Sequence, residues 1–216
     1  MSKLYAYASL IAAAALSCGP ASAQQFALFA PPPQQQAALP QNVVPDTPAD
    51  DQSDENAQVD PRLQKQIVDY PTREAAGSVI VDTPHTYLYY VLGGGKAIRY
   101  GIGVGRSEGT NFHGSAVIGR KEKWPHWTPT ANMMAAIPMY RHYAGGMNGG
   151  PDNPLGPRAL YLYRDGHDTF FRLHGTTEPE SIGQAVSSGC IRLFNQDIID
   201  LYNRVPVGAH VTVVQG

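Results

Sequence analysis

The sequence predicts a mainly β domain with one or two short helices. Tyrosine and glycine are abundant, with 12 and 22 residues among 216, whereas charged residues make up only 16%. This composition is typical of a domain rich in strands and turns rather than of a helical bundle. From residue 79 onward, short β-branched and aromatic runs recur between Gly, Pro, Asn and Asp, which is the pattern of strands separated by turns.

Two pairs of apolar runs predict hairpins. Residues 87–92 and 97–104 flank three consecutive glycines, and residues 159–163 and 169–173 flank the polar turn 164–168. Further strands are expected at residues 79–81, 116–118 and 211–214. The alternating glycines at 101, 103 and 105 fall inside one expected strand and are not followed by Lys-Ser or Lys-Thr, so they do not form a phosphate-binding loop.

A first helix is predicted at residues 130–136. Thr128 precedes it as a cap, and Pro129 suits its first helical position. The following segment, 143–157, is rich in Gly, Pro and Asn and is expected to be a long loop, and loops of this length in compact domains are often functional.

A second helix is predicted near the end of the chain. Asn195 is expected to cap it, Asp197 suits its positive end, and Pro206 and Gly208 end it. Its apolar stripe has the spacing i, i+3, i+4 and i+7 and consists of Ile198, Leu201, Tyr202 and Val205.

The first 23 residues are expected to be a cleaved signal peptide. Lys3 precedes an apolar run over residues 4–16, which is too short to span a bilayer, and Ala21 and Ala23 provide the small residues that a signal peptidase reads. Lipidation at Cys18 is disfavoured, because the usual Leu three residues before such a cysteine is missing. Export of the chain is therefore expected.

Residues 24–76 are expected to form a disordered tether before a folded domain at 77–216. The tether is dominated by Pro, Gln, Ala and Asp as far as residue 61, and such a segment buries too little apolar area to offset its ordering entropy. A helical turn or two is expected at 63–69. The overall hydrophobic fraction of 43% agrees with a long unpacked segment.

Charge excludes one class of partner. The formal net charge is -2, so the chain lacks the basic balance expected of a nucleic-acid-binding protein, and no nucleic-acid partner is expected.

Cysteine usage singles out Cys190. The chain has two cysteines, and removal of the signal peptide would take Cys18 and leave Cys190 alone. Secreted domains use cysteines in pairs, so a single one is either a small buried apolar residue or a working thiol. One cysteine without a Cys-x-x-Cys partner is a poor start for a metal site, and neither a metal nor a cofactor is expected.

The residues around Cys190 favour the working thiol. Cysteine attacks as the thiolate and needs a base or positive neighbour, together with hydrogen-bond donors for the oxyanion. Ser187, Ser188 and Gly189 form a turn before the thiol, and His174 stands at a strand end sixteen positions earlier. A Cys–His pair on a loop-rich sheet edge is the minimum for acyl transfer through a thioester. The other six histidines are expected to be surface or loop residues.

The motifs resemble those of the L,D-transpeptidase catalytic domain, also called the YkuD-like domain, in its proteobacterial form. The resemblance covers roughly residues 77–214 and is carried by His174-Gly175-Thr176, Ser181-Ile182-Gly183, Ser187-Ser188-Gly189-Cys190-Ile191-Arg192, and stretches at 100–105, 124–129, 149–156 and 200–206. It implies the β-sandwich fold of this family and a periplasmic cysteine acyltransferase that acts on peptidoglycan in cell-wall biogenesis.

The resemblance also implies residue roles. Cys190 is the nucleophile and His174 the base, with the Gly175 carbonyl orienting the imidazole. The N–H groups of Gly189 and Cys190 form the oxyanion hole. Arg192 contributes to holding the donor peptide, with a surface salt bridge as the alternative reading.

The flanking serines are taken as part of the substrate-binding turn. Ser187 and Ser188 are both assigned there, and Ser188 stands where many family members have His, which leaves its own role open.

Three acyl acceptors remain open for the implied reaction. After cleavage of a tetrapeptide stem behind its third residue, the acyl group would pass to another stem, giving a 3–3 cross-link, to the N-terminus of an outer-membrane protein, or to water. Carbapenems are implied as covalent inhibitors. A non-catalytic wall-binding module is the alternative from another class, and an intact Cys and His argue against it.

Overall fold

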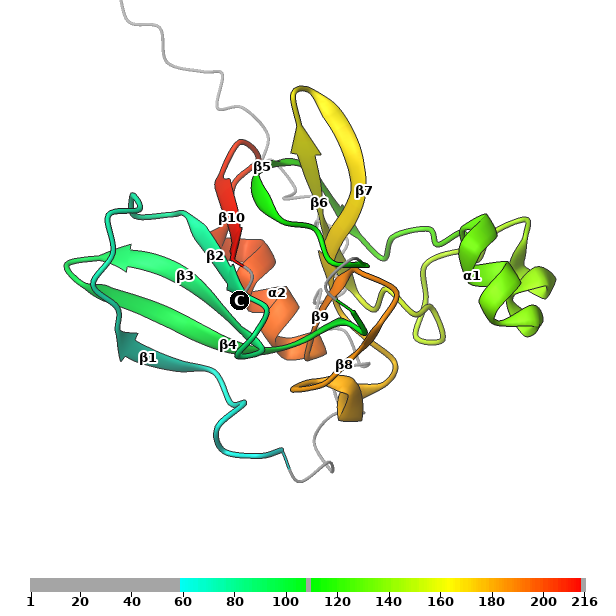
Figure 1. Ribbon diagram of the computed structural model, residues 1–216, viewed down its shortest axis with the longest axis horizontal. Helices are drawn as coiled ribbons and strands as arrows, with labels where there is room; N and C mark the ends of the chain where they lie inside the picture. The colour runs from blue at the N-terminus through cyan, green and yellow to red at the C-terminus, as the bar shows by residue number, and fades with distance from the viewer. Residues whose placement is uncertain (1–58, 108–109, 215–216) are drawn as a thin grey trace, which may run out of the picture. The chain divides into compact units, whose positions relative to one another are not determined.

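The computed structural model describes residues 59–107 and 110–214 of the chain (Figure 1). The predicted signal peptide at 1–23 and the tether as far as residue 58 lie outside these residues. The described strands are β1 (Gln66–Asp69), β2 (Val79–Asp82), β3 (Tyr87–Gly93), β4 (Lys96–Gly105), β5 (Gly114–Lys123), β6 (Arg158–Arg164), β7 (His167–His174), β8 (Ala185–Ser187), β9 (Ile191–Leu193) and β10 (His210–Val214). The helices are α1 (Ala131–Ala136), α2 (Asn195–Arg204) and the short 3-10 helices η2 (Pro138–Tyr143) and η3 (Pro179–Ser181).

The prediction of a mainly β fold is confirmed. The strands pair in the order β1-β4-β3-β2-β10-β5-β6-β7-β9, with β8 beside β4. Because β9 also pairs with β4, the ladder closes on itself. Most neighbours are antiparallel, but β7 and β9 run parallel, as do β2 and β10 and also β4 and β8. This parallel pair of β7 and β9 carries the candidate site.

The two predicted hairpins are confirmed. β3 and β4 are joined through Gly94 and Gly95, and β6 and β7 through Asp165 and Gly166. The second turn is shorter than predicted, since only these two residues separate the strands. Both have positive φ, +52° and +80°, which is the geometry that matches the right-handed twist of a hairpin.

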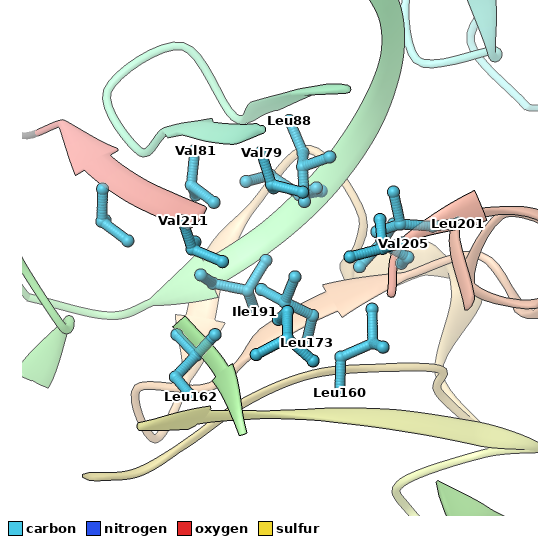
Figure 2. Packing of buried hydrophobic residues seen from close by; sticks show 14 of the residues in the cluster. Val79, Val81, Leu88, Leu160, Leu162, Leu173, Ile191, Leu201, Val205 and Val211 are labelled. Carbon is cyan, nitrogen blue, oxygen red and sulfur yellow. The ribbon is translucent and has the colours of Figure 1, made fainter. Parts of the chain in front are cut away.

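The core lies between the two halves of the closed ladder. Figure 2 shows Val79 and Leu88 from β2 and β3 facing Leu160 and Leu162 from β6, with Leu173 and Ile191 nearby. These side chains are almost completely buried. Leu201 and Val205 of α2 and its C-terminal end join the same cluster, so the predicted apolar stripe does contact the core.

The folded region begins before residue 77, which corrects the predicted boundary. Residues 66–69 are strand β1, antiparallel to β4, rather than the helical turns expected at 63–69. Gly101 N–H donates to the carbonyl of Leu63 at 3.1 Å, and the ring of Tyr70 stacks on that of Tyr89 at 4.3 Å. This stretch is polar and largely exposed, and its order comes from pairing with β4 rather than from its own pattern.

Both helix starts also differ from prediction. The first helix begins at Ala131, and its cap is Thr130, whose hydroxyl accepts from Met133 N–H at 3.2 Å, because Pro129 stays outside the helix. Asn195 does not cap α2; the cap position is Phe194, without a side-chain hydrogen bond. Asp197 lies in the first turn of α2 as expected.

Within the described residues, none of the helices has the length and apolar character needed to cross a membrane.

Candidate active site

The register of β7 and β9 places the predicted site residues on one face. His174 pairs with Arg192, and Leu173 pairs with Ile191. Leu173 and Ile191 point into the core. Because side chains alternate along strands, His174 and Arg192 point to the opposite face. Cys190 immediately precedes β9 and therefore shares that face with His174.

A hydrogen-bonded turn presents Cys190. The hydroxyl of Ser187 donates to the Cys190 carbonyl at 2.7 Å and accepts from Gly189 N–H at 3.1 Å. Gly189 has a φ of +128°, and a Cβ there would collide with the carbonyl oxygen of Thr110. Glycine is thus required both by the backbone conformation and by the close approach.

This geometry bears on three sequence predictions. Ser187, expected at the substrate, is buried and shapes the turn. Ser188 is exposed, and its substrate role stays a prediction. Gly189 N–H, expected to serve the oxyanion, donates to Ser187 in this structure.

His174 is buried and oriented by its own chain. Its Nδ1 lies 2.6 Å from the carbonyl oxygen of Gly175, the partner expected from the sequence. A carbonyl only accepts, so Nδ1 carries the proton and Nε2 keeps its lone pair. Burial, and secondarily the positive charge of Arg192, lowers the pKa of His174 from 6.5 to about 3. The ring is therefore neutral at physiological pH and can act as a base through Nε2.

The Cys190 thiol lies against β7. Sγ is 3.9 Å from the carbonyl oxygen of Phe170. Desolvation raises the pKa of the Cys190 thiol, while the positive charge of Arg172 opposes that rise. The backbone N–H of Arg172 also acts on the sulfur and lowers the pKa of the thiol. The resting pair is thus a thiol and a neutral imidazole.

Arg192 is fixed at the edge of the site. Its Nη1 donates to Glu178 Oε2 at 2.5 Å, and its side chain is 18% exposed, against 53% for that of Glu178. The salt bridge that the sequence left as an alternative is therefore present, and its carboxylate side faces solvent. Glu178 engages Nη1 of this guanidinium, which has five N–H donors in all.

Asn195 is a site residue that the sequence assigned differently. Its Oδ1 accepts from Thr176 N–H at 2.9 Å, which ties the start of α2 to the loop after His174. Gly175 lies so close to this amide that a Cβ there would collide with Oδ1. Asn195 thus holds the segment whose carbonyl orients the histidine.

The bulge in β7 was not predicted either. Tyr161 pairs with Arg172 and Tyr163 with Asp168, so β7 has extra residues between these pairs. Phe170, inside the bulge, has a φ of +63° and is 74% exposed. Its N–H donates to Asp168 Oδ1 at 2.8 Å. Bulges of this kind often stand next to active sites, where they re-aim the backbone.

Across the described ranges 59–107 and 110–214, no group of three or more His, Cys, Asp or Glu side chains is arranged to hold a metal ion.

Residues 76–213 match the family model described as the L,D-transpeptidase catalytic domain, YkuD. "Probable L,D-transpeptidase YbiS" of Escherichia coli (strain K12) is 38% identical over 145 residues, covering 64% of this chain and 44% of that protein. "Putative L,D-transpeptidase in ATP synthase subunits region ORF 5" of Fuscovulum blasticum is 35% identical over 137 residues, covering 63% of this chain and 68% of that protein.

The chain spans less than half the length of the Escherichia coli relative. A crystal structure from Brucella melitensis, described as a probable carnitine operon oxidoreductase, is 43% identical, with 72% of this chain and 96% of that chain covered and a TM-score of 0.49. The superposition is too loose to transfer a function from it. The family match, by contrast, includes every element that builds the site, from β2 to β10. The chain belongs to the L,D-transpeptidase catalytic-domain family.

Proposed function

We propose that this protein is a periplasmic L,D-transpeptidase that forms 3–3 cross-links between peptidoglycan stems through a thioester on Cys190. The observation that carries the proposal is the placement of a neutral, carbonyl-oriented His174 and Cys190 on one face of the parallel β7–β9 pair. A thiol, a base and a structured turn are the parts that acyl transfer requires. Family membership supports the reaction class.

In the first half-reaction, Cys190 loses its proton to Nε2 of His174, and the sulfur attacks the carbonyl carbon of the third residue of a tetrapeptide stem. In the resting site Sγ lies 3.9 Å from the Phe170 carbonyl, so the thiol gives up this contact when its proton passes to His174. The C–N bond to the terminal D-Ala then breaks, and the leaving amine takes the proton from His174. A thioester and free D-Ala result.

In the second half-reaction, the amine of a second stem attacks the thioester. His174 takes a proton from the attacking amine, the C–S bond breaks, and the proton returns to sulfur. The low pKa of His174 makes its imidazolium short-lived, so each proton is passed on rather than stored. The same base therefore serves both halves.

Developing negative charge on the substrate oxygen needs donors in the Cys190 turn. The N–H of Cys190 is the donor that the turn presents with the nucleophile. Gly189 N–H would join it only by releasing Ser187, to which it donates at 3.1 Å. Arg192 would hold a carboxylate of the donor stem.

The periplasmic location rests on the signal-peptide pattern of residues 1–23, and the acceptor choice rests on the cell-wall chemistry of the family. Transfer to an outer-membrane protein or to water uses the same thioester and differs only in the second half-reaction.

Mass spectrometry of disaccharide tetrapeptides incubated with the purified chain tests the proposal. A dimer that has lost one D-Ala is expected with wild type and absent with Cys190→Ala. Release of tripeptide without dimer would show that water is the acceptor. A disaccharide tetrapeptide whose mass stays unchanged would overturn the proposed reaction.

A further inference from the structure

Arg172 lies beside Cys190 on the outer face of the sheet. The register of β7 and β9 pairs Leu173 with Ile191, and its extension by one residue places Arg172 next to Cys190. The position of Sγ agrees, since it is 3.9 Å from the carbonyl of Phe170 in the same stretch of β7. The thiol is therefore neighbour to an arginine that no motif of the sequence singled out.

The guanidinium of Arg172 is held in place from two directions. Asp168 Oδ2 accepts from its Nη2 at 3.3 Å, and the ring of Tyr161 lies 4.7 Å from its central carbon. The side chain is only 18% exposed. Tyr161 is itself fixed, because its hydroxyl donates to Glu122 Oε2 at 2.6 Å and Arg120 of β5 lies over the same ring at 3.6 Å. A partly buried cation held in this way keeps a defined direction to its neighbour.

The site needs such a charge because its histidine does not supply one. The pKa of His174 is near 3, so an imidazolium partner for a thiolate is costly in the resting site. The positive charge of Arg172 acts in the same sense on both groups: it lowers the pKa of Cys190 and that of His174. It therefore favours a thiolate beside a neutral imidazole.

The other charged groups near the thiol are accounted for. Arg192 of β9 also lowers the pKa of Cys190, but by less than Arg172 does. Both arginines are ion-paired, Arg192 with Glu178 and Arg172 with Asp168. Asp168 of β7 raises that pKa. Arg120 of β5 is paired with Glu122 on the same strand, and Tyr161 of β6 stands between β5 and β7.

We propose that Arg172 is a positioning residue that acts through Cys190: it provides the positive charge that stabilises the thiolate, and Tyr161 and Asp168 hold it there. The inference rests on the proposed function, because a stabilised thiolate serves acyl transfer, but its test does not depend on that function. It gives the β7 bulge a role, since the bulge brings Asp168, the Phe170 carbonyl and Arg172 to one place.

Two substitutions of one ion pair test the charge directly. Arg172→Gln removes the positive charge and is expected to move the pH midpoint of Cys190 alkylation upward. Asp168→Asn removes the negative charge and is expected to move it downward, while the Asn Oδ1 can still accept from Phe170 N–H. Both variants break the same ion pair, so a purely structural effect would move the two midpoints in the same direction.

The measurement is the rate of alkylation by iodoacetamide between pH 6 and pH 10, read at Cys190 by peptide mass spectrometry on the full chain. Opposite shifts are expected, with a several-fold slower rate for Arg172→Gln at pH 7.5, because each unit of thiol pKa is about tenfold in thiolate fraction well below the pKa. Arg172→Lys should keep most of the wild-type midpoint. Arg120→Gln, on the far side of Tyr161, should shift it less than Arg172→Gln does.

Midpoints that stay unchanged, or that move in the same direction, would overturn the inference. An unchanged midpoint together with a raised KM for the donor stem would show that Arg172 binds a carboxylate of the substrate instead. If Arg172→Gln fails to fold, the downward shift of Asp168→Asn still decides. Because alkylation needs no peptidoglycan, a chain that shows the shifts but forms no cross-links would refute the proposed function alone.

Discussion

The Nδ1 of His174 donates to the carbonyl of the next residue, Gly175, at 2.6 Å. A backbone carbonyl does not take up a proton at neutral pH, and a side-chain substitution does not remove it. The tautomer of the base is thus fixed by the fold of the loop, and Asn195 holds that loop through Thr176 N–H.

The lowered pKa of His174 predicts a pH dependence of stability. The unfolded chain binds a proton here near pH 6.5, whereas the folded chain does so only near pH 3. Between these values the unfolded state binds more protons, so this contribution is full above pH 6.5 and is lost as the pH falls toward 3. Urea unfolding at pH 7.5, 6 and 5 should show that the free energy of unfolding of wild type falls as the pH is lowered. The fall should be smaller in His174→Asn, whose side-chain amide keeps a donor for Gly175. The exposed His210, replaced by Gln, is the control and should behave as wild type. Equal slopes for wild type and His174→Asn would contradict the burial argument.

Ser187 and Ser188 form a matched pair for the turn. Ser187→Ala removes a hydroxyl that donates to the Cys190 carbonyl and accepts from Gly189 N–H. It should lower the free energy of unfolding by about 2 kcal/mol, because two hydrogen bonds are lost in a buried setting. Ser188→Ala should leave stability unchanged, since Ser188 is exposed. Thermal unfolding of both variants checks this, and equal effects would mean that the turn does not depend on Ser187.

Phe170 tests whether the β7 bulge is strained. Its φ of +63° is unfavourable for phenylalanine and alanine but not for glycine, and its ring is 74% exposed, so little burial is at stake. Phe170→Gly should therefore be more stable than Phe170→Ala by about 1 kcal/mol. Comparing the two variants with each other removes the shared loss of the ring. A Gly variant no more stable than the Ala variant would show that the bulge costs nothing.

The start of the folded domain gives a further prediction. A chain beginning at residue 77 lacks β1, the Leu63 carbonyl that Gly101 N–H reaches, and the Tyr70 ring on Tyr89. It should unfold at a lower temperature than a chain beginning at residue 59. Its free energy of unfolding should be lower by roughly 1–3 kcal/mol, because the hydrogen bonds and the ring contact are lost. Calorimetry on the two truncations compares them directly. Identical melting would restore the boundary at 77 that the composition predicted.

The sequence predicted the elements whose pattern is local. Both hairpins alternate around turn residues, and α2 has a clear apolar stripe, so β3, β4, β6, β7 and α2 were placed correctly. The catalytic roles of Cys190 and His174 were inferred from the Ser-Ser-Gly turn before the cysteine together with the motif resemblance, and those roles stay a prediction.

The missed features depend on partners far along the chain. β1 is short and exposed and is ordered by β4, while β9 has only three residues and is defined by pairing with β4 and β7. Asn195 looks like a helix cap in sequence, yet its amide is used by Thr176, nineteen positions earlier. The positive φ of Phe170 has no sequence signal, because phenylalanine rarely adopts the left-handed conformation and does not predict it.

Acylation of Cys190 tests the central claim most directly. The full chain is incubated with a carbapenem, and the intact mass and the modified peptide are measured. Opening of the β-lactam ring by the thiolate adds the whole inhibitor, so the account predicts one adduct, located on Cys190, and none on Cys190→Ala. An adduct that persists on Cys190→Ala, or a wild-type chain that stays unmodified while it cross-links stems, would place the nucleophile elsewhere and contradict the account.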